Sequence, residues 1–194
     1  MKNNIFITGK QGSGKTNLLM SIYKGMKLPF CGYYTTDLIE KNIRRGYVVN
    51  NLKGRKGIFA HENSSSDIKI SKFGVDLDVF ELIAVKQIEE CLEYFPNKVV
   101  IMDEVGKKEF LSSRFRKIFE KALASPNIVI ASVTLRKNIQ FDRYFNRDDS
   151  LVFEINQNNR SLVKENVMEI VNRLWDELEL GSQELSYYAK LMEN

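Results

Sequence analysis

Apolar and polar positions divide the chain into short apolar runs and longer stretches with helical spacing. The short runs are rich in β-branched and aromatic residues, which strands favour. The run at residues 99–102 is apolar throughout, as in a parallel strand that is buried on both faces. We predict strands at residues 5–7, 32–36, 46–49, 57–60, 99–102, 128–133 and 151–155.

Helical spacing of apolar residues recurs between these runs, and proline or glycine stands near its ends. We predict that Gly181 ends the last long helix and that a short helix follows it. The long helices are expected at residues 17–26, 78–95, 115–123 and 163–178.

Strands that alternate with helices predict an α/β domain with a mostly parallel sheet flanked by helices. Residues 32–60 differ, because three runs follow one another and residues 50–54 have hairpin chemistry. We expect an antiparallel β insert here, on the main sheet.

The composition fits one domain of 194 residues with 43% hydrophobic and 28% charged residues. A net charge of +4 is too small to indicate nucleic acid by itself, so such a partner is possible but not indicated. No apolar run approaches the ~20 residues that span a bilayer, and the first residues form no signal-peptide core. We expect a cytoplasmic protein without membrane contact, as a monomer or weak homo-oligomer.

The cysteines Cys31 and Cys91 show no C-x-x-C spacing, and His61 is the only histidine. These features argue against a zinc site built by the protein. Two reduced thiols are the plainer interpretation, and a disulfide is the alternative.

A phosphate-binding loop follows the first strand. The sequence fits G-x-x-x-x-G-K-[ST] at every fixed position, and glycines let backbone N–H groups approach phosphate oxygens. Lys15 can reach the β- and γ-phosphates, and the Thr16 hydroxyl can bind Mg²⁺. We predict that a nucleoside triphosphate such as ATP or GTP binds to Gly9, Lys10, Gln11, Gly12, Ser13, Gly14, Lys15, Thr16 and Asn17.

Two acids end the apolar strand at 99–102. Beside a phosphate loop, Asp103 can hold Mg²⁺ directly or through water. Glu104 can orient or deprotonate an attacking water. The pair therefore favours water as the phosphate acceptor.

These motifs resemble the small nucleoside-triphosphatase family shared by archaea, bacteria and animals. The resemblance covers residues 5–160, and its most specific part is the segment 101–110, similar to the family's I-D-E-[IV]-G-K-M-E-L. Its other marks are the phosphate loop, Gly32-Tyr33-Tyr34-Thr35, Arg44-Arg45-Gly46-Tyr47, Lys72-Phe73-Gly74-Val75 and Asn159-Arg160.

The resemblance implies a RecA-like P-loop fold and Mg²⁺-dependent cleavage of nucleoside triphosphates to diphosphate and phosphate, with broad base tolerance. It also implies that Glu104 activates water and that Lys107 lies near the γ-phosphate. We expect a catalytic domain at 1–160 and a helical extension at 161–194.

One departure concerns positive charge at the site. The family usually has an arginine shortly after the segment at 32–35, and Ile39 occupies that position here. Arg44 is the nearest replacement, so we place Arg44 and Lys107 beside Lys15 as candidates to stabilise the leaving phosphate. Arg160 either approaches the base or ribose, or caps the last strand.

Two other functions stay open on the same loop. A small-molecule or nucleoside kinase needs a basic lid, and a nucleotide-dependent switch needs a protein or RNA partner. A guanine-specific switch is disfavoured because no N-K-x-D motif follows the loop. A solvated loop is the commoner interpretation of the candidate lid, which contains Arg136, Lys137, Phe141, Arg143, Tyr144, Phe145 and Arg147.

Overall fold

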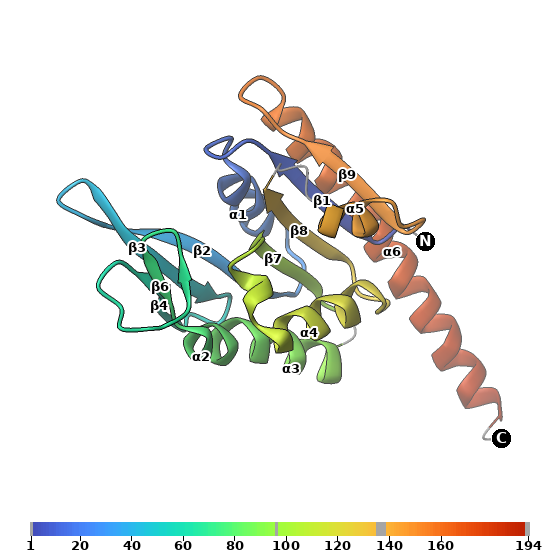
Figure 1. Ribbon diagram of the computed structural model, residues 1–194. Coiled ribbons are helices and arrows are strands. Elements are labelled where there is room, and N and C mark those ends of the chain that lie inside the picture. The colour runs from blue at the N-terminus through green and yellow to red at the C-terminus, as the bar shows by residue number, and fades with distance from the viewer. Residues whose placement is uncertain (1, 96, 135–138, 193–194) are drawn as a thin grey trace.

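The computed structural model describes the backbone of residues 2–95, 97–134 and 139–192. These residues form one nine-stranded sheet with the order β5-β6-β4-β3-β2-β7-β8-β1-β9 (Figure 1). The predicted mostly parallel sheet with helices and an antiparallel insert is confirmed.

The parallel half of the sheet contains five strands in the order β2-β7-β8-β1-β9. β8 lies between the strand that precedes the phosphate loop and the strand that ends in the two acids. Because all five strands run the same way, their carboxyl ends meet at one edge of the sheet. These strands are β1 (Asn4–Gly9), β2 (Phe30–Glu40), β7 (Val99–Val105), β8 (Val129–Thr134) and β9 (Ser150–Glu154).

The antiparallel half continues from β2. This strand pairs with β7 over residues 30–33 and with the next strand over residues 33–40. The insert therefore extends the same sheet beyond the carboxyl end of β7 (Figure 1). It contains the predicted strands β3 (Ile43–Asn51) and β4 (Lys56–His61), and also β5 (Lys69–Ile70) and β6 (Phe73–Val75), which we did not predict.

Helices cover both faces of the parallel half (Figure 1). One buried cluster lies under α1 (Lys15–Gly25) and α6 (Arg160–Met192). The other is rich in phenylalanine and lies under α2 (Leu77–Phe80), the π-helical turn Glu81–Val85, α3 (Lys86–Tyr94), the 3-10 turn Glu109–Leu111, α4 (Ser113–Leu123) and α5 (Ile139–Phe145).

The predicted end of the last helix at Gly181 is wrong. α6 continues through this residue to Met192 as a single helix. A glycine inside a helix costs only about 1 kcal/mol relative to alanine, and Gly181 is exposed with open space around it. Val163, Val167 and Val171 of α6 are buried against the sheet, and the domain boundary at residue 160 stays a prediction.

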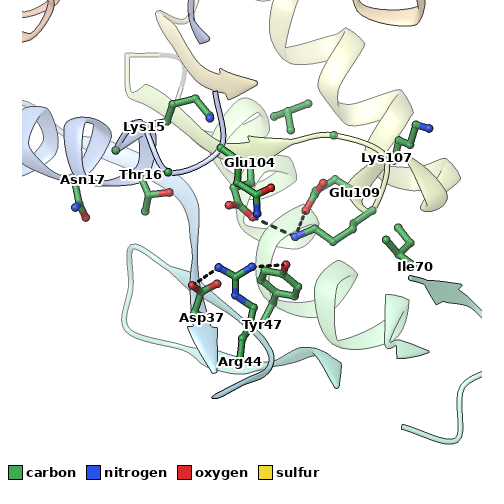
Figure 2. Close-up of a pocket in the computed structure, with 16 residues that line it drawn as sticks. Lys15, Thr16, Asn17, Asp37, Arg44, Tyr47, Ile70, Glu104, Lys107 and Glu109 are labelled. Atoms are coloured by element: carbon green, nitrogen blue, oxygen red, sulfur yellow. Dashed lines mark hydrogen bonds and ion pairs between the residues drawn. The ribbon is translucent and has the colours of Figure 1, made fainter. Parts of the chain in front are cut away.

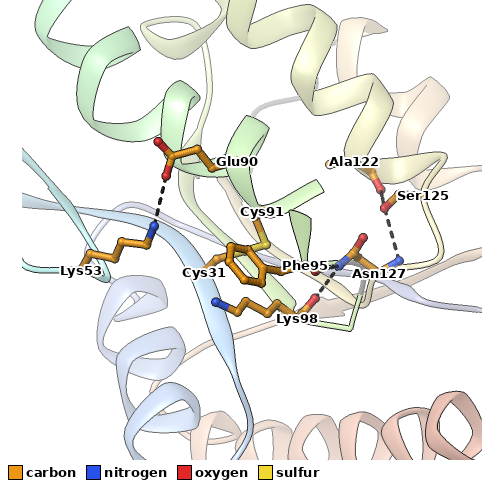
Figure 3. Close-up of a disulfide and its surroundings, with 9 residues drawn as sticks. All are labelled: Cys31, Lys53, Glu90, Cys91, Phe95, Lys98, Ala122, Ser125 and Asn127. Atoms are coloured by element: carbon orange, nitrogen blue, oxygen red, sulfur yellow. Dashed lines mark hydrogen bonds and ion pairs between the residues drawn. A yellow bond between two sulfur atoms is a disulfide. The ribbon is translucent and has the colours of Figure 1, made fainter. Parts of the chain in front are cut away.

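The expectation of two reduced thiols is also wrong. Cys31 in β2 and Cys91 in α3 form a disulfide, with their Cα atoms 6.3 Å apart (Figure 3). Both residues are buried, and α3 packs directly on β2. The pairing depends on this long-range packing, because 60 residues separate the cysteines and no spacing motif marks them.

We predict that this disulfide stabilises the fold by constraining the unfolded chain. A crosslink that closes a loop of 60 residues corresponds to about 4 kcal/mol of free energy of unfolding in the chain-entropy model. Urea unfolding of the protein with and without a reductant should show a loss of this order.

The matched control is the variant Cys31→Ala/Cys91→Ala, whose unfolding midpoint should not respond to the reductant. Thiol labelling of the denatured, unreduced protein gives an independent check. Labelling of both cysteines under these conditions would show that the bond does not form.

Candidate active site

The phosphate loop connects β1 to α1 and presents free backbone N–H groups. Gly14 precedes the helix with φ 88°, a left-handed conformation that glycine adopts without strain. No side chain caps the helix N-terminus, and its first turn contains no acid. The positive end of the helix dipole is thus available to an anion such as a phosphate.

Lys15 folds back into the loop. Its ammonium donates hydrogen bonds to the carbonyl oxygens of Gly9 at 2.9 Å and Lys10 at 3.1 Å. Burial lowers the pKa of Lys15, and the nearby carboxylates of Glu104 and Asp103 oppose this shift. The loop therefore contributes a buried cation on the side that faces the acids of β7.

Asp103 lies at the carboxyl end of β7 and is fully buried. Its Oδ2 accepts hydrogen bonds from the Thr16 hydroxyl at 2.8 Å and from the Thr35 backbone N–H at 3.2 Å. Its Oδ1 accepts a hydrogen bond from the Ser132 hydroxyl at 2.6 Å. Burial raises the pKa of Asp103, and these hydrogen bonds counteract the rise.

The side-chain oxygens of Thr16 and Asp103 are suitable ligands for a hard divalent cation. A hydroxyl and a carboxylate are ligands of the type that Mg²⁺ prefers, and Mg²⁺ at nucleotide sites usually keeps waters and phosphate oxygens as further ligands. Within residues that the structure describes, no cluster of three or more His, Cys, Asp or Glu side chains could hold a metal by itself. Thr16 and Asp103 therefore suit a metal ion that phosphate oxygens of a nucleotide also bind.

Glu104 leaves the strand in a different direction from Asp103. Its φ of 54° is left-handed, which is uncommon for a residue with a side chain. The Ser132 hydroxyl accepts a hydrogen bond from the Glu104 N–H at 2.8 Å. Ser132 thus holds the Asp103 carboxylate and the Glu104 backbone, and the Glu104 carboxylate lies at the cavity beside the loop (Figure 2).

The cavity has a volume of about 500 Å³ and three walls (Figure 2). The loop and α1 form the first wall, the β insert the second, and the segment after β7 the third. The lining residues are Gln11, Gly12, Gly14, Lys15, Thr16 and Asn17 on the first wall, Asp37, Arg44, Tyr47 and Ile70 on the second, and residues 104–109 on the third.

Most of the residues expected at a nucleotide site line this cavity. Gly9 and Lys10 contribute the carbonyls that hold Lys15, and Ser13 has a buried hydroxyl within the loop. Lys107 lines the cavity, and Figure 2 shows its ammonium directed away from Glu104. Arg160 begins α6 and reaches the loop, since a Cβ at Gly14 would collide with its guanidinium.

Arg44 lies directly opposite Ile39 in the β2–β3 hairpin. Its guanidinium forms an ion pair with Asp37 at 2.9 Å and donates a hydrogen bond to the Tyr47 hydroxyl at 3.3 Å. Side chains of directly opposed residues share one face of a sheet. Arg44 therefore occupies the region that an arginine at position 39 would reach.

The candidate lid lies in part outside the described residues, which include neither Arg136 nor Lys137, nor the side chain of Phe141. Part of the segment is the helix α5, where a loop was expected. Arg143 pairs with Glu120 of α4 at 2.8 Å, and Arg147 pairs with Asp149 at 2.6 Å. Neither arginine lines the cavity.

A partly buried ionic cluster beside Glu104 was not predicted from the sequence. Lys108 forms ion pairs with Glu104 at 3.1 Å and with Glu109 at 3.7 Å. Glu109 is fully buried, and its carboxylate has no hydrogen-bond partner among the described residues. Lys107-Lys108-Glu109 resembles an exposed charged turn in sequence, so no local signal indicates that Glu109 is buried and Lys108 is partly buried.

Burial raises the pKa of Glu109 to about 7. The Lys108 ammonium opposes this rise, whereas the carboxylates of Glu104 and Asp103 add to it. The buried Tyr33 phenol also faces this cluster, and burial, followed by the charge of Glu109, raises its pKa. Glu109 is therefore a buried acid beside the cavity whose pKa lies near neutral pH.

A sheet that brings a phosphate loop and a buried aspartate to one edge defines the class of the molecule, a P-loop nucleotide-binding protein. The NTPase family model matches residues 4–168, and the chain belongs to that family. It is 36% identical to nucleoside-triphosphatase THEP1 of Thermotoga petrophila over 162 residues, which cover 83% of this chain and 89% of that protein.

Two solved structures are similar to this fold. The crystal structure of THEP1 from Aquifex aeolicus superposes with a TM-score of 0.76 at 27% identity, covering 86% of this chain and 98% of that one. The solution structure of a human cancer-related nucleoside triphosphatase gives 0.73 at 25% identity, covering 87% and 97%. Within the described residues, no helix has the length and apolarity needed to cross a membrane.

We predict that Glu109 makes stability depend on pH. Its folded pKa of about 7 lies above the ordinary value of 4.5, so the folded state binds the proton more tightly. The stabilisation is complete below the ordinary value and is lost as pH rises through the folded pKa. Between about pH 5 and about pH 8 the loss should be roughly 2 to 3 kcal/mol.

The measurement is urea unfolding of the protein and of Glu109→Gln across this pH range. The variant lacks the titrating group, so its stability relative to the unsubstituted protein should increase with pH. Two stability curves that run parallel would show that Glu109 does not titrate in this range.

Proposed function

We propose that this protein hydrolyses nucleoside triphosphates, including ATP and GTP, to the diphosphate and phosphate with Mg²⁺ as cofactor. The observation that carries the proposal is the position of Glu104, whose carboxylate lines the same cavity as the phosphate loop and lies one residue after the buried Asp103. The relatives' names support nucleoside triphosphates as the substrate class.

The loop performs the binding step. Its N–H groups and the N-terminus of α1 surround the β- and γ-phosphates, and the Lys15 ammonium exchanges its carbonyl partners for phosphate oxygens. Thr16 and Asp103 would hold Mg²⁺, which neutralises charge on the phosphates. The nucleotide is thereby fixed with its γ-phosphate toward Glu104.

Glu104 then serves the chemical step. Its carboxylate accepts a proton from a water molecule that attacks the γ-phosphorus, and the bond to the β-phosphate oxygen breaks. Charge that develops on the transferred group requires cations, and Lys15, Lys107 and Arg44 all line the cavity. Arg160 beside Gly14 is suited to contact the nucleoside end.

We predict that phosphate release needs Lys15 and Glu104 in different ways. Lys15→Ala should weaken nucleotide binding, because it removes the cation inside the loop. Glu104→Gln should keep nucleotide affinity and lower kcat by about 10²- to 10⁴-fold, because it removes the general base. The measurements are phosphate release with Mg²⁺ and a panel of nucleoside triphosphates, and binding of a fluorescent analogue.

The acceptor and the partner are tested by the same assay. Steady release in buffer alone supports water as the acceptor. Release that begins only after a nucleoside or metabolite is added would replace the hydrolase by a kinase. Release that requires RNA or a second protein would replace it by a nucleotide-dependent switch.

We predict that Arg44 supplies the positive charge that Ile39 does not. Arg44→Ala should lower kcat at least about 10-fold, because the transition state of phosphoryl transfer gains from an arginine at the γ-phosphate. Since the two positions are directly opposed in the hairpin, Ile39→Arg in the Arg44→Ala background should restore most of the loss.

The matched control is Ile39→Arg alone, which reports what a second arginine does when Arg44 is present. Steady-state phosphate release at saturating nucleotide measures all three variants. An unchanged kcat in Arg44→Ala would remove Arg44 from the catalytic set.

A further inference from the structure

Lys108 lies on the third wall of the cavity, between two carboxylates. Its Nζ is 3.1 Å from Oε2 of Glu104 and 3.7 Å from Oε1 of Glu109. The dashed lines that reach Glu104 and Glu109 in Figure 2 mark these two ion pairs. Only 16% of the Lys108 side chain is exposed, so the ammonium is held inside the protein rather than in solvent.

Aromatic rings hold the same ammonium from the side of the insert. The Nζ lies 3.8 Å from the ring centroid of Tyr47 and 5.7 Å from that of Phe59. A cation over the face of an aromatic ring is attracted to it, most strongly when both are shielded from water. The Lys108 ammonium is thus held by the buried Glu109 carboxylate and by the ring of Tyr47.

The Glu104 side chain is less restricted by the rest of the protein than the Lys108 ammonium is. Its backbone is held by Ser132, but its side chain is 36% exposed and has several rotamers available. The hydrogen bond that its carboxylate accepts comes from Lys108 Nζ at 3.1 Å. The fixed ammonium therefore selects the direction in which this flexible acid points.

We infer that Lys108 is a positioning residue for hydrolysis, which holds the Glu104 carboxylate in place to receive the proton of the attacking water. This inference rests on the proposed function, in which Glu104 is the general base. Its action differs from that of Lys15, since the donors of Lys108 face carboxylates and an aromatic ring rather than the phosphate loop.

The arrangement also links the insert to the chemistry. Tyr47 lies under the Lys108 ammonium, and its hydroxyl accepts the hydrogen bond from Arg44, which pairs with Asp37. Asp37, Arg44 and Tyr47 come from β2 and β3, whereas Lys108 follows β7. A continuous series of contacts therefore joins the β2–β3 hairpin to Glu104.

The test separates positioning of the base from binding of the nucleotide. Lys108→Met keeps a side chain of similar length but removes the ammonium, and with it the ion pairs and the cation–π contacts with Tyr47 and Phe59. Because it leaves Glu109 buried without a cation, it is combined with Glu109→Gln, and Glu109→Gln alone is the reference variant. Lys108→Gln, also combined with Glu109→Gln, is the second variant and is used if the first double variant does not fold.

We expect kcat for phosphate release to fall about 10- to 100-fold in the double variant relative to Glu109→Gln, because a misplaced catalytic group costs a loss of this order. The KM for the nucleotide and the affinity for a fluorescent analogue should change less than about 3-fold. Lys108→Arg keeps a cation at this position and should recover most of the rate.

Two outcomes would overturn the inference. A kcat in the double variant equal to or above that of Glu109→Gln would show that the ammonium does not orient Glu104 productively. A loss of nucleotide affinity as large as the loss of kcat would show that Lys108 binds phosphate. Failure of the proposed function is recognised separately, as full activity in Glu104→Gln. If both assignments hold, adding Lys108→Met to a variant that already carries Glu104→Gln and Glu109→Gln should lower kcat no further.

Discussion

The buried carboxylate of Asp103 is the group on which the rest of the site depends. An ionised acid in the interior is costly unless hydrogen bonds compensate it. Its three partners come from separate elements, Thr16 from α1, Thr35 from β2 and Ser132 from β8. Compensation of one charge therefore requires that the start of α1 and the strands β2, β7 and β8 are in place, which couples formation of the site to folding of the sheet.

The direction of Glu104 follows from the same constraint. Ser132 donates to Asp103 and accepts from the Glu104 N–H, so one hydroxyl fixes both acids. The left-handed φ of 54° at Glu104 costs energy, and strained residues of this kind persist where surrounding contacts over-determine them. The strain turns the second acid out of the strand and into the cavity, while the first stays buried beside Thr16.

The parts of the site that the sequence predicts are those encoded locally. The phosphate loop and the acids after the apolar strand are contiguous motifs, and the structure brings them together as expected. The contacts of Ser132 and the disulfide depend on strand pairing and helix packing between distant segments, which no single segment specifies. Arg44, by contrast, lies in the same hairpin as Ile39, and its position in the sequence already indicates it as the nearest replacement. The continuation of α6 past Gly181 shows that propensity at one residue is too weak to end a helix.

The strand β2 takes part in several of the contacts that build the site. The disulfide attaches its beginning to α3 at Cys31, its middle donates the Thr35 N–H to Asp103, and its end presents Asp37 to Arg44. The strand changes partner from β7 to β3 at Tyr33, so it belongs to the parallel core and to the insert at once. A displacement of the insert must therefore move one wall of the cavity beside the phosphate loop, which makes the hairpin part of this cavity rather than an appendage.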